Sequence, residues 1–374
     1  GAGDRCPGRG IKFMPYPDTH TCWVGIDTSN YTTSVSLAVR EPDAPGRLRV
    51  VSNRKAPLPV APGARGLRQS DALFAHTRNL PELMRLLRAD MEAGGWCPAA
   101  VGVSARPRDA ADSYMPCFLA GVAAAEAFAA GAGVPLYRFS HQSGHIMAAL
   151  YSSGSLLCDR SAGELPDGDF LAFHVSGGTT EAVLAHPVPG GFSVEIVGYG
   201  ADLHAGQVID RVGVLLGLPF PCGPALEALA RTCTVPLPPI RPSVRGGVCN
   251  LSGFENQAAK LWAETSDAPL VAAWVLTAVG KTLRLMTDQI QESLRSCRPA
   301  PLPVLYAGGV MSNRFIRPLL TAGAAWECRF SEPAFSADNA AGIALLCAEA
   351  ALAAERDNAG RSSGSGKGAR HDGT

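Results

Sequence analysis

The sequence predicts an α/β protein with two lobes, each built from one copy of a duplicated unit. Its 374 residues, 47% of them hydrophobic, are enough to fill two cores. A strand, a turn rich in hydroxyl or glycine residues and a second strand occur near residue 25 and again near residue 175. Each hairpin opens a similar order of elements, which indicates a repeat. This arrangement suits a nucleotide clamped between the lobes, because each turn directs backbone N–H groups at phosphate.

The first unit is expected at residues 22–152, after an N-terminal extension of residues 1–21. Its opening hairpin surrounds Asp27, Thr28 and Ser29, which form a possible phosphate-binding turn. The elements expected after this hairpin are a strand at 48–52, a helix at 71–91 kinked or broken at Pro81, a strand at 100–104, a helix at 115–130 and a strand at 134–139.

The second unit is expected at residues 153–354 and contains helical insertions. Two strands flank the loop at 175–179, and a third strand follows at 193–197. After the insertions come a strand at 303–307, which runs into a glycine turn, and a closing helix at 338–354. Residues 355–374 are rich in serine and glycine, so we expect them to form a disordered tail.

Two histidines open the helix that follows the strand at 134–139. Ser140 is the expected N-cap, and His141 and His145 come directly after it. Positions i and i+4 lie on one face of a helix, about 6 Å apart, so both imidazoles can contact one ion. The alternative is a histidine pair buried in the core or at an interface, because this spacing alone is a weak motif.

A third metal ligand must come from another part of the chain. Asp338, at the start of the closing helix, is a candidate if the lobes face each other, and its alternative role is an N-cap. Two imidazoles and one carboxylate leave open coordination positions, which suits a catalytic or ligand-binding iron or zinc ion.

The glycine-rich loop of the second unit is a candidate nucleotide site. Gly177 and Gly178 let a ligand approach the backbone closely, and Ser176 and Thr179 add hydroxyl donors. The alternative for this loop is an ordinary hairpin turn.

Three further positions extend the candidate nucleotide site. Asp210 is expected to accept hydrogen bonds from ribose hydroxyls, or else to form a surface ion pair with Arg211. The turn that contains Gly223 offers flat backbone to a sugar or base, and Asn313 follows a glycine turn as a side-chain donor.

Composition limits the partners and the compartment. Lysine plus arginine and aspartate plus glutamate number 33 each, so any nucleic-acid partner must be held by a local patch. The 11 cysteines include no Cys-x-x-Cys pair, which favours free thiols in a reducing, cytoplasmic compartment. The apolar stretch at 118–137 carries Glu126 and divides into a helix and a strand, so we expect no membrane span.

The motifs, taken together and in order, resemble the TsaD family of tRNA N6-adenosine threonylcarbamoyl transferases over roughly residues 22–350. The matching segments are Gly25–Ser29, His141-x-x-x-His145, Val175–Thr179, Gly206-x-x-x-Asp210, Gly223-Pro224, Leu251–Gly253, Ala307–Asn313 and Asp338-Asn339. The resemblance implies an actin-like, sugar-kinase-like duplicated fold. It also implies transfer of a threonylcarbamoyl group from threonylcarbamoyl-AMP to N6 of adenosine 37 in tRNAs that read codons starting with A.

The resemblance further implies roles for individual residues. His141, His145 and Asp338 would hold one divalent ion, Fe²⁺ or Zn²⁺, which would act as a Lewis acid. ATP or threonylcarbamoyl-AMP would be the nucleotide ligand, and tRNA and accessory proteins of the pathway would be partners. The residues implied to hold the nucleotide are Val175, Ser176, Gly177, Gly178, Thr179, Asp210, Gly223 and Asn313.

The chain departs from the usual pattern of this family on the nucleotide and tRNA sides of the cleft. Asp27 and Gln207 stand where glutamates are usual, and Thr179 stands where a histidine is usual. The segments at 105–108 and 66–70 replace a Gly-Pro-Gly turn and an acidic-basic motif. Two alternatives therefore stay open: a paralogue that carbamoylates a substrate other than tRNA, and a nucleotide-binding scaffold without turnover.

Overall fold

The first lobe is built on a five-stranded sheet with the order β3-β2-β1-β4-β5. The computed structural model describes residues 20–29, 31–59, 67–109, 112–153, 168–189, 191–336 and 338–364, so nearly all of the expected N-terminal extension and the last ten residues lie outside it. β1 pairs antiparallel with β2 and parallel with β4, and β4 pairs parallel with β5. The strands are β1 (Thr21–Ser29), β2 (Thr32–Glu41), β3 (Ala44–Pro57), β4 (Cys97–Arg106) and β5 (Leu136–Ser140).

The second lobe repeats this order within a seven-stranded sheet, β12-β11-β6-β7-β8-β10-β9. Three antiparallel strands, β8-β7-β6, are again followed by two parallel ones, β11 and β12. The fold is therefore the predicted duplicated α/β fold of the actin-like and sugar-kinase-like type. The strands are β6 (Phe170–Val175), β7 (Thr180–Val188), β8 (Gly191–Gly200), β9 (Ser243–Arg245), β10 (Val248–Asn250), β11 (Val304–Ala307) and β12 (Cys328–Phe330).

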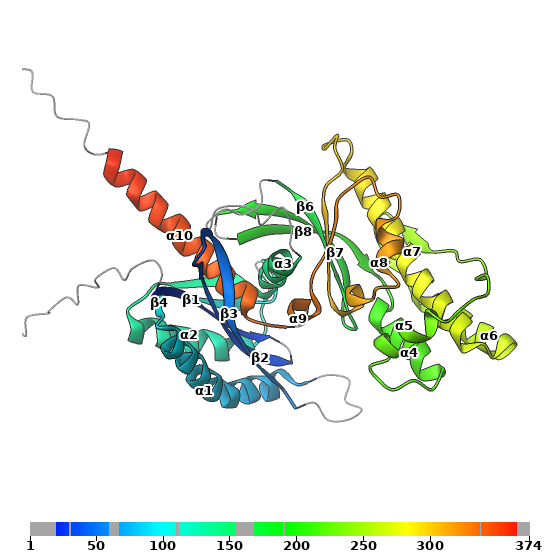
Figure 1. Cartoon of the computed structure of the whole chain (residues 1–374), viewed down its shortest axis with the longest axis horizontal. Coiled ribbons are helices and arrows are strands. Elements are labelled where there is room, and N and C mark those ends of the chain that lie inside the picture. The colour runs from blue at the N-terminus through cyan, green and yellow to red at the C-terminus, as the bar shows by residue number, and fades with distance from the viewer. Residues whose placement is uncertain are drawn as a thin grey trace, which may run out of the picture.

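Helices cover both sheets, and two of them lie between the lobes (Figure 1). α1 (Gln69–Gly94) and α2 (Phe118–Ala132) pack on the outer face of the first sheet. α3 (His141–Ser152) and α10 (Ala341–Gly364) share one buried cluster with residues of both sheets. The second lobe carries α4 (Ala205–Leu215), α5 (Gly223–Ala230), α6 (Ser252–Thr265), α7 (Ala268–Leu294) and α8 (Arg317–Thr321), with the short elements η3 (Gly309–Ser312) and α9 (Pro333–Ser336) nearby.

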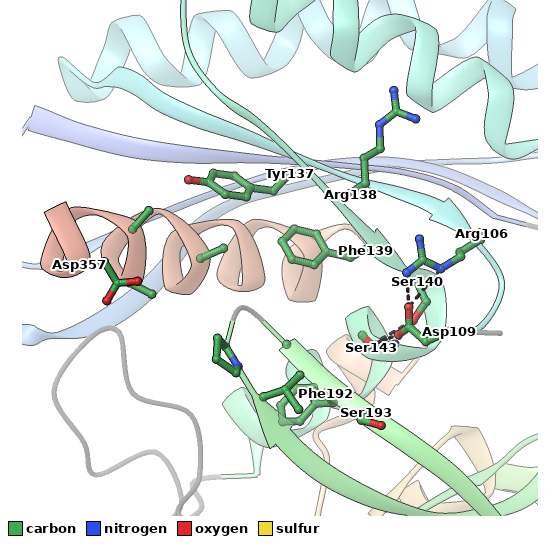
Figure 2. Close-up of a pocket in the computed structure, with 16 residues that line it drawn as sticks. Arg106, Asp109, Tyr137, Arg138, Phe139, Ser140, Ser143, Phe192, Ser193 and Asp357 are labelled. Carbon is green, nitrogen blue, oxygen red and sulfur yellow. Dashed lines mark hydrogen bonds and ion pairs between the residues drawn. The ribbon is translucent and has the colours of Figure 1, made fainter. Parts of the chain in front are cut away.

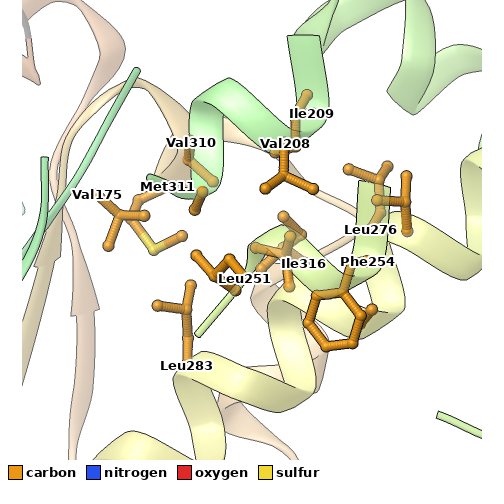
Figure 3. Close-up of a cluster of buried hydrophobic side chains, with 14 of the residues drawn as sticks. Val175, Val208, Ile209, Leu251, Phe254, Leu276, Leu283, Val310, Met311 and Ile316 are labelled. Carbon is orange, nitrogen blue, oxygen red and sulfur yellow. The ribbon is translucent and has the colours of Figure 1, made fainter. Parts of the chain in front are cut away.

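The core of the second lobe forms around α7. Asp267 caps this helix by accepting a hydrogen bond from the backbone N–H of Leu270 at 3.0 Å. α7 is long and apolar enough to cross a membrane, but 83% of its apolar window is buried inside the lobe. Leu276 and Leu283 on this helix share one buried cluster with Leu251 and with Phe254 of α6 (Figure 3). The apolarity of α7 is therefore that of a core helix.

Three expected boundaries change in the structure. α1 is assigned as one continuous helix through Pro81, not a broken one. α10 continues to Gly364, so the predicted start of the tail at residue 355 is wrong. The closing helix, expected as part of the second lobe, packs mainly on the first sheet and on α3.

Two glycines explain where α10 lies. A Cβ atom on Gly25 of β1 would stand 2.5 Å from the carbonyl oxygen of Ala340, and one on Gly102 of β4 would stand 2.9 Å from that of Ile343. These contacts are closer than side chains permit, so the first sheet accepts the backbone of α10 only because both positions are glycine.

Candidate metal centre and adjoining cavity

The predicted metal ligands come from elements that begin or end at one edge of the fold. β4 and β5 run parallel to β1, and β11 runs parallel to β6, so the carboxyl ends of these strands face the space between the lobes. α3 starts where β5 ends, and Ser140 is its N-cap as predicted, accepting from the backbone N–H of Ser143 at 3.1 Å. The first turn of α3 therefore places its side chains in the cleft.

His141, His145 and Asp338 form one cluster in this cleft. Their ligand atoms all lie within 4.8 Å of one another. Nε2 of His141 is 3.6 Å from Oδ1 of Asp338, and Nε2 of His145 is 3.3 Å from the same oxygen. The two imidazole rings are 4.2 Å apart between centroids, so α3 presents both to the same carboxylate.

These distances are short enough for the three side chains to share one metal ion. Two ligands on a tetrahedral ion with bonds of about 2.0–2.1 Å lie about 3.3 Å apart. Nitrogen and carboxylate donors also match iron and zinc, so the residues present fit the implied divalent ion.

Asp338 is free to face the histidines because its neighbour caps α10. Asn339 accepts a hydrogen bond from the backbone N–H of Ala341 at 3.0 Å. Asn339 therefore has the capping role that was the alternative for Asp338. Next to this cap, Gly342 lies directly against the backbone of Gly144 in α3, where a Cβ atom would overlap the carbonyl group.

Asp27 supports the cluster from behind. Its Oδ1 lies 3.2 Å from Nδ1 of His141, and it also accepts hydrogen bonds from Ser29 at 2.6 Å and from Ser104. A carboxylate on Nδ1 fixes the tautomer in which Nε2 carries the lone pair, which is the form that binds metal. Asp27 is thus placed to orient a metal ligand.

The predicted phosphate turn is not an open anion site. Asp27, Thr28 and Ser29 are all fully buried. The hydroxyl of Thr28 donates to the carbonyl of Cys117 at 3.1 Å and accepts from the backbone N–H of Gly121 at 3.1 Å. These side chains bind the turn to α2 and to the histidine cluster, so no side chain of the turn is left to meet a phosphate.

Charges around the cluster shift three pKa values. Burial disfavours a charged His141, but Asp27 and Asp338 outweigh it and raise its pKa to about 10. Burial would raise the pKa of Asp338, but the two imidazoles lower it far below its usual range. Burial would raise the pKa of Asp27, but His141, Ser104 and Ser29 outweigh this effect and lower it. The two carboxylates therefore attract positive charge, either a proton or a cation that replaces it.

A cavity of about 550 Å³ adjoins the cluster. Part of its wall is apolar, formed by Ile146, Ala149, Ala172, Val183, Leu305 and Ala307. Three of the predicted nucleotide residues, Ser176, Gly178 and Thr179, line the same cavity. This volume is typical of a small-molecule site, and the cavity brings the loop after β6 together with the metal ligands.

The loop at 175–179 is open on the side where Gly177 and Gly178 would carry a Cβ atom. Added Cβ atoms on Gly177 and Gly178 would meet nothing within 4 Å. The other side of the loop packs on α4, where a Cβ on Gly206 would stand 2.6 Å from the backbone nitrogen of Gly177. Val175 is buried beneath the loop, against Gly308.

The remaining predicted nucleotide residues do not line this cavity. Asp210 accepts a hydrogen bond from the backbone N–H of Cys222 at 2.8 Å, next to Gly223 at the start of α5. Asn313 is buried, and its side-chain oxygen accepts from the backbone N–H groups of Phe315 and Ile316. Both side chains hold turns through these bonds, and the nucleotide contacts expected of them stay a prediction.

Sequence reasoning missed two polar side chains on the wall of the cavity. His174 on β6 lies 4.9 Å from His145 between ring centroids, and burial together with His145 lowers its pKa to about 3. Glu181 on β7 is the cross-strand neighbour of His174. A histidine and a glutamate in otherwise apolar strands were the signal that could have identified them.

A second cavity of about 560 Å³ lies on the other side of the start of α3 (Figure 2). Asp109 accepts hydrogen bonds there from Ser140 at 2.7 Å and Ser143 at 3.0 Å, and it pairs with Arg106. The carboxylate of Asp109 thus ties the loop after β4 to the first turn of α3.

The duplicated fold and the cluster of two imidazoles and one carboxylate define a two-lobed α/β protein with a candidate metal centre in its cleft. The model of one family, described as "TsaD: tRNA N6-adenosine threonylcarbamoyltransferase", matches residues 114–345, well over half of the chain. The chain therefore belongs to the TsaD family.

Solved structures with a similar chain path come from several kinds of protein. Component A of the Acidaminococcus fermentans (R)-2-hydroxyglutaryl-CoA dehydratase is 15% identical, with a TM-score of 0.45 and coverage of 89% of this chain and 99% of that one. HypF from T. kodakarensis is 12% identical, with a TM-score of 0.49 and coverage of 91% and 48%. YeaZ from Pseudomonas aeruginosa is 12% identical, with a TM-score of 0.29 and coverage of 47% and 67%.

Proposed function

We propose that this protein transfers a threonylcarbamoyl group from threonylcarbamoyl-AMP to N6 of adenosine 37 in tRNAs that read codons starting with A. The observation that carries the proposal is the cluster of His141, His145 and Asp338, held by Asp27 and opening on a cavity that the loop after β6 also lines. Membership of the TsaD family supplies the reaction class.

Each wall of the cleft has a role in this proposal. His141, His145 and Asp338 hold one divalent ion, Fe²⁺ or Zn²⁺, which supplies Lewis-acid chemistry when bound. The open backbone at Gly177 and Gly178 binds phosphate of ATP or of the adenylate. The apolar wall excludes water from the acyl group, which protects it from hydrolysis.

The partners proposed are tRNA and accessory proteins of the threonylcarbamoyl pathway. The compartment proposed is the cytoplasm. The nine cysteines in the described part of the chain are all free, and a reducing compartment would keep them so.

The second candidate function is transfer of a carbamoyl-type group to an acceptor other than tRNA. The segment at 105–108, which stands where the family usually has a Gly-Pro-Gly turn, places Arg108 in contact with Glu181 of the other lobe at 2.8 Å. This ion pair lies on the wall of the candidate active site, so it alters the surface that an acceptor meets.

The decisive experiment is complementation of a strain that lacks its own transferase, with modified adenosine measured in bulk tRNA. The chain is supplied with its cognate partner proteins, and the purified protein is analysed for bound metal. We expect modified tRNA and about one metal ion per chain. Metal and adenylate binding without modified tRNA would support the second candidate, and a protein with neither metal nor transfer would refute both.

The variants His145→Ala and Asp338→Ala test the metal site directly. We expect each to lose bound metal and tRNA modification, because each removes one of three protein ligands. His186→Gln is the matched control, since His186 pairs with Asp169 in the second lobe, outside the cluster.

A further inference from the structure

A charged group that the metal chemistry does not use lies on the wall of the same cavity. Arg108, in the loop after β4, donates from Nη2 to Oε2 of Glu181 at 2.8 Å. Gln142, the residue after His141, donates to the other carboxylate oxygen at 3.0 Å. All three residues line the cavity that the metal ligands also line.

The three residues come from both lobes. Arg108 and Gln142 belong to the first lobe, and Glu181 is on β7 of the second lobe. Both oxygens of Glu181 are thus held by first-lobe donors, and its side chain is 11% exposed. A buried carboxylate that accepts from two donors is held in one position and can orient the groups bonded to it.

The side chain of Arg108 is 48% exposed, so it is much more accessible than that of Glu181. Glu181 uses one nitrogen of the guanidinium, Nη2. Within the described part of the chain, no acceptor is bonded to Nη1 or Nε of Arg108. Guanidinium is a planar fork that binds carboxylate or phosphate through two parallel N–H groups. Glu181 therefore aligns the fork and leaves donors for a ligand.

We propose that Arg108, aligned by Glu181 and Gln142, is a specificity residue that binds an oxyanion of the acyl substrate, either a carboxylate or a phosphate. This inference rests on the proposed function, because it assumes that the acyl group and its adenylate occupy the cavity of about 550 Å³. An anionic group on Arg108 then orients the substrate relative to His141, since Gln142, the residue after His141, donates to the same carboxylate as Arg108.

The electrostatics of Glu181 supports this assignment. Burial raises the pKa of Glu181, and Arg108 and Gln142 oppose the rise. A ligand oxyanion on the free edge of Arg108 leaves the pair with Glu181 in place, whereas complete loss of Arg108 leaves a buried carboxylate without its cation. Tests of Arg108 must therefore include a variant in which both charges are removed.

The test measures binding to the full chain purified with its metal. The probes are N-carbamoyl-L-threonine, its carboxamide, which lacks the negative charge, and AMP. The variants are Arg108→Gln, Arg108→Lys and the double variant Arg108→Gln/Glu181→Gln, each checked for folding by its thermal unfolding. Arg106→Gln is the matched control, because Arg106 is two residues away but faces Asp109 in the second cavity (Figure 2).

The wild-type protein is expected to bind N-carbamoyl-L-threonine about tenfold or more tightly than the carboxamide. This preference should disappear in Arg108→Gln and in the double variant, weaken in Arg108→Lys, and persist in Arg106→Gln. If AMP binding falls instead and the preference for carboxylate is absent, the oxyanion is the phosphate of the adenylate.

The inference is overturned if Arg108→Gln and the double variant bind all three probes as the wild type does, or if the wild type binds none of them. Its failure is separable from failure of the proposed function. A protein whose carboxylate preference depends on Arg108 but which modifies no tRNA keeps this inference and loses the tRNA acceptor.

Discussion

Gly342 of α10 lies so close to Gly144 of α3 that a Cβ atom on Gly342 would overlap the carbonyl group of Gly144. Gly144 stands between His141 and His145 in the sequence, and Gly342 comes four residues after Asp338. The crossing of the two helices therefore sets the distance between the imidazoles and the carboxylate. Backbone contact between two glycines is what lets three ligands from distant parts of the chain meet.

This crossing predicts the effect of Gly342→Ala. The added methyl group must push α3 and α10 apart, which should lower the free energy of unfolding by about 1–3 kcal/mol and reduce bound metal. Urea denaturation and metal analysis of the purified variant measure both effects. Gly131→Ala in α2 is the control, because a Cβ there meets nothing within 4 Å, and it should retain metal with unchanged or slightly raised stability. Normal stability and metal content in Gly342→Ala would show that the helices adjust freely.

Asp27→Asn is predicted to weaken metal binding without removing a ligand. The amide keeps the size of the side chain but loses the charge that holds Nδ1 of His141, and loss of such a partner typically costs about 10–100-fold in metal affinity. Competition with a chelator measures this change. Asp169→Asn serves as control, because Asp169 contacts a different histidine, His186, at 2.7 Å. Equal metal affinity in wild type and Asp27→Asn would mean that His141 binds metal without being oriented by the charge of Asp27.

The parts of the site that the sequence predicted are those encoded locally. The spacing of His141 and His145 after the cap at Ser140 needs only helix geometry, and both the helix and its cap are confirmed. Asp338 could be assigned only through family resemblance and an assumption about facing lobes, since nothing local ties it to a metal. The fold class followed from the repeated order of elements, and the structure shows that order in both sheets.

The parts that were missed depend on contacts between distant segments. Arg108 and Glu181 are 73 residues apart and belong to different lobes, so no periodicity links them. The position of α10 on the first sheet depends on two glycines, Gly25 in β1 and Gly102 in β4, and nothing in their local sequence indicates a contact with this helix. The burial of Thr28 against α2 likewise turns a hydroxyl that suggested phosphate binding into a packing contact.

Gly206→Ala is predicted to weaken nucleotide binding while leaving the metal centre intact. A Cβ on Gly206 would stand 2.6 Å from the backbone nitrogen of Gly177, so the loop after β6 must move. AMP affinity should fall, whereas metal content should stay as in the wild type because α4 contributes no ligand. Gly131→Ala, which lies in α2 and not in the loop, is a matched control for volume, since its Cβ would meet nothing within 4 Å. Unchanged AMP affinity in Gly206→Ala would remove the loop from the nucleotide site.

Asp169 is predicted to make the stability of the second lobe depend on pH. It accepts hydrogen bonds from Arg298 at 3.0 Å and from His186 at 2.7 Å, just before β6 begins. Burial would raise its pKa, but Arg298 and His186 lower it below its usual value. Because the folded pKa is the lower one, the contribution to stability is complete above the unfolded pKa of about 3.9 and is lost as pH falls through the folded value.

Asp169→Asn should therefore lower the free energy of unfolding by about 1 kcal/mol at pH 7, and the difference from wild type should shrink below about pH 4. Urea denaturation at pH 7 and at pH 3.5 measures the two differences. Asp288→Asn is the control, because Asp288 pairs with Arg284 within α7 and its side chain is 44% exposed, so solvent screens the pair. If Asp169→Asn lowers the free energy of unfolding equally at both pH values, the loss comes from poor packing of the amide and not from the missing charge.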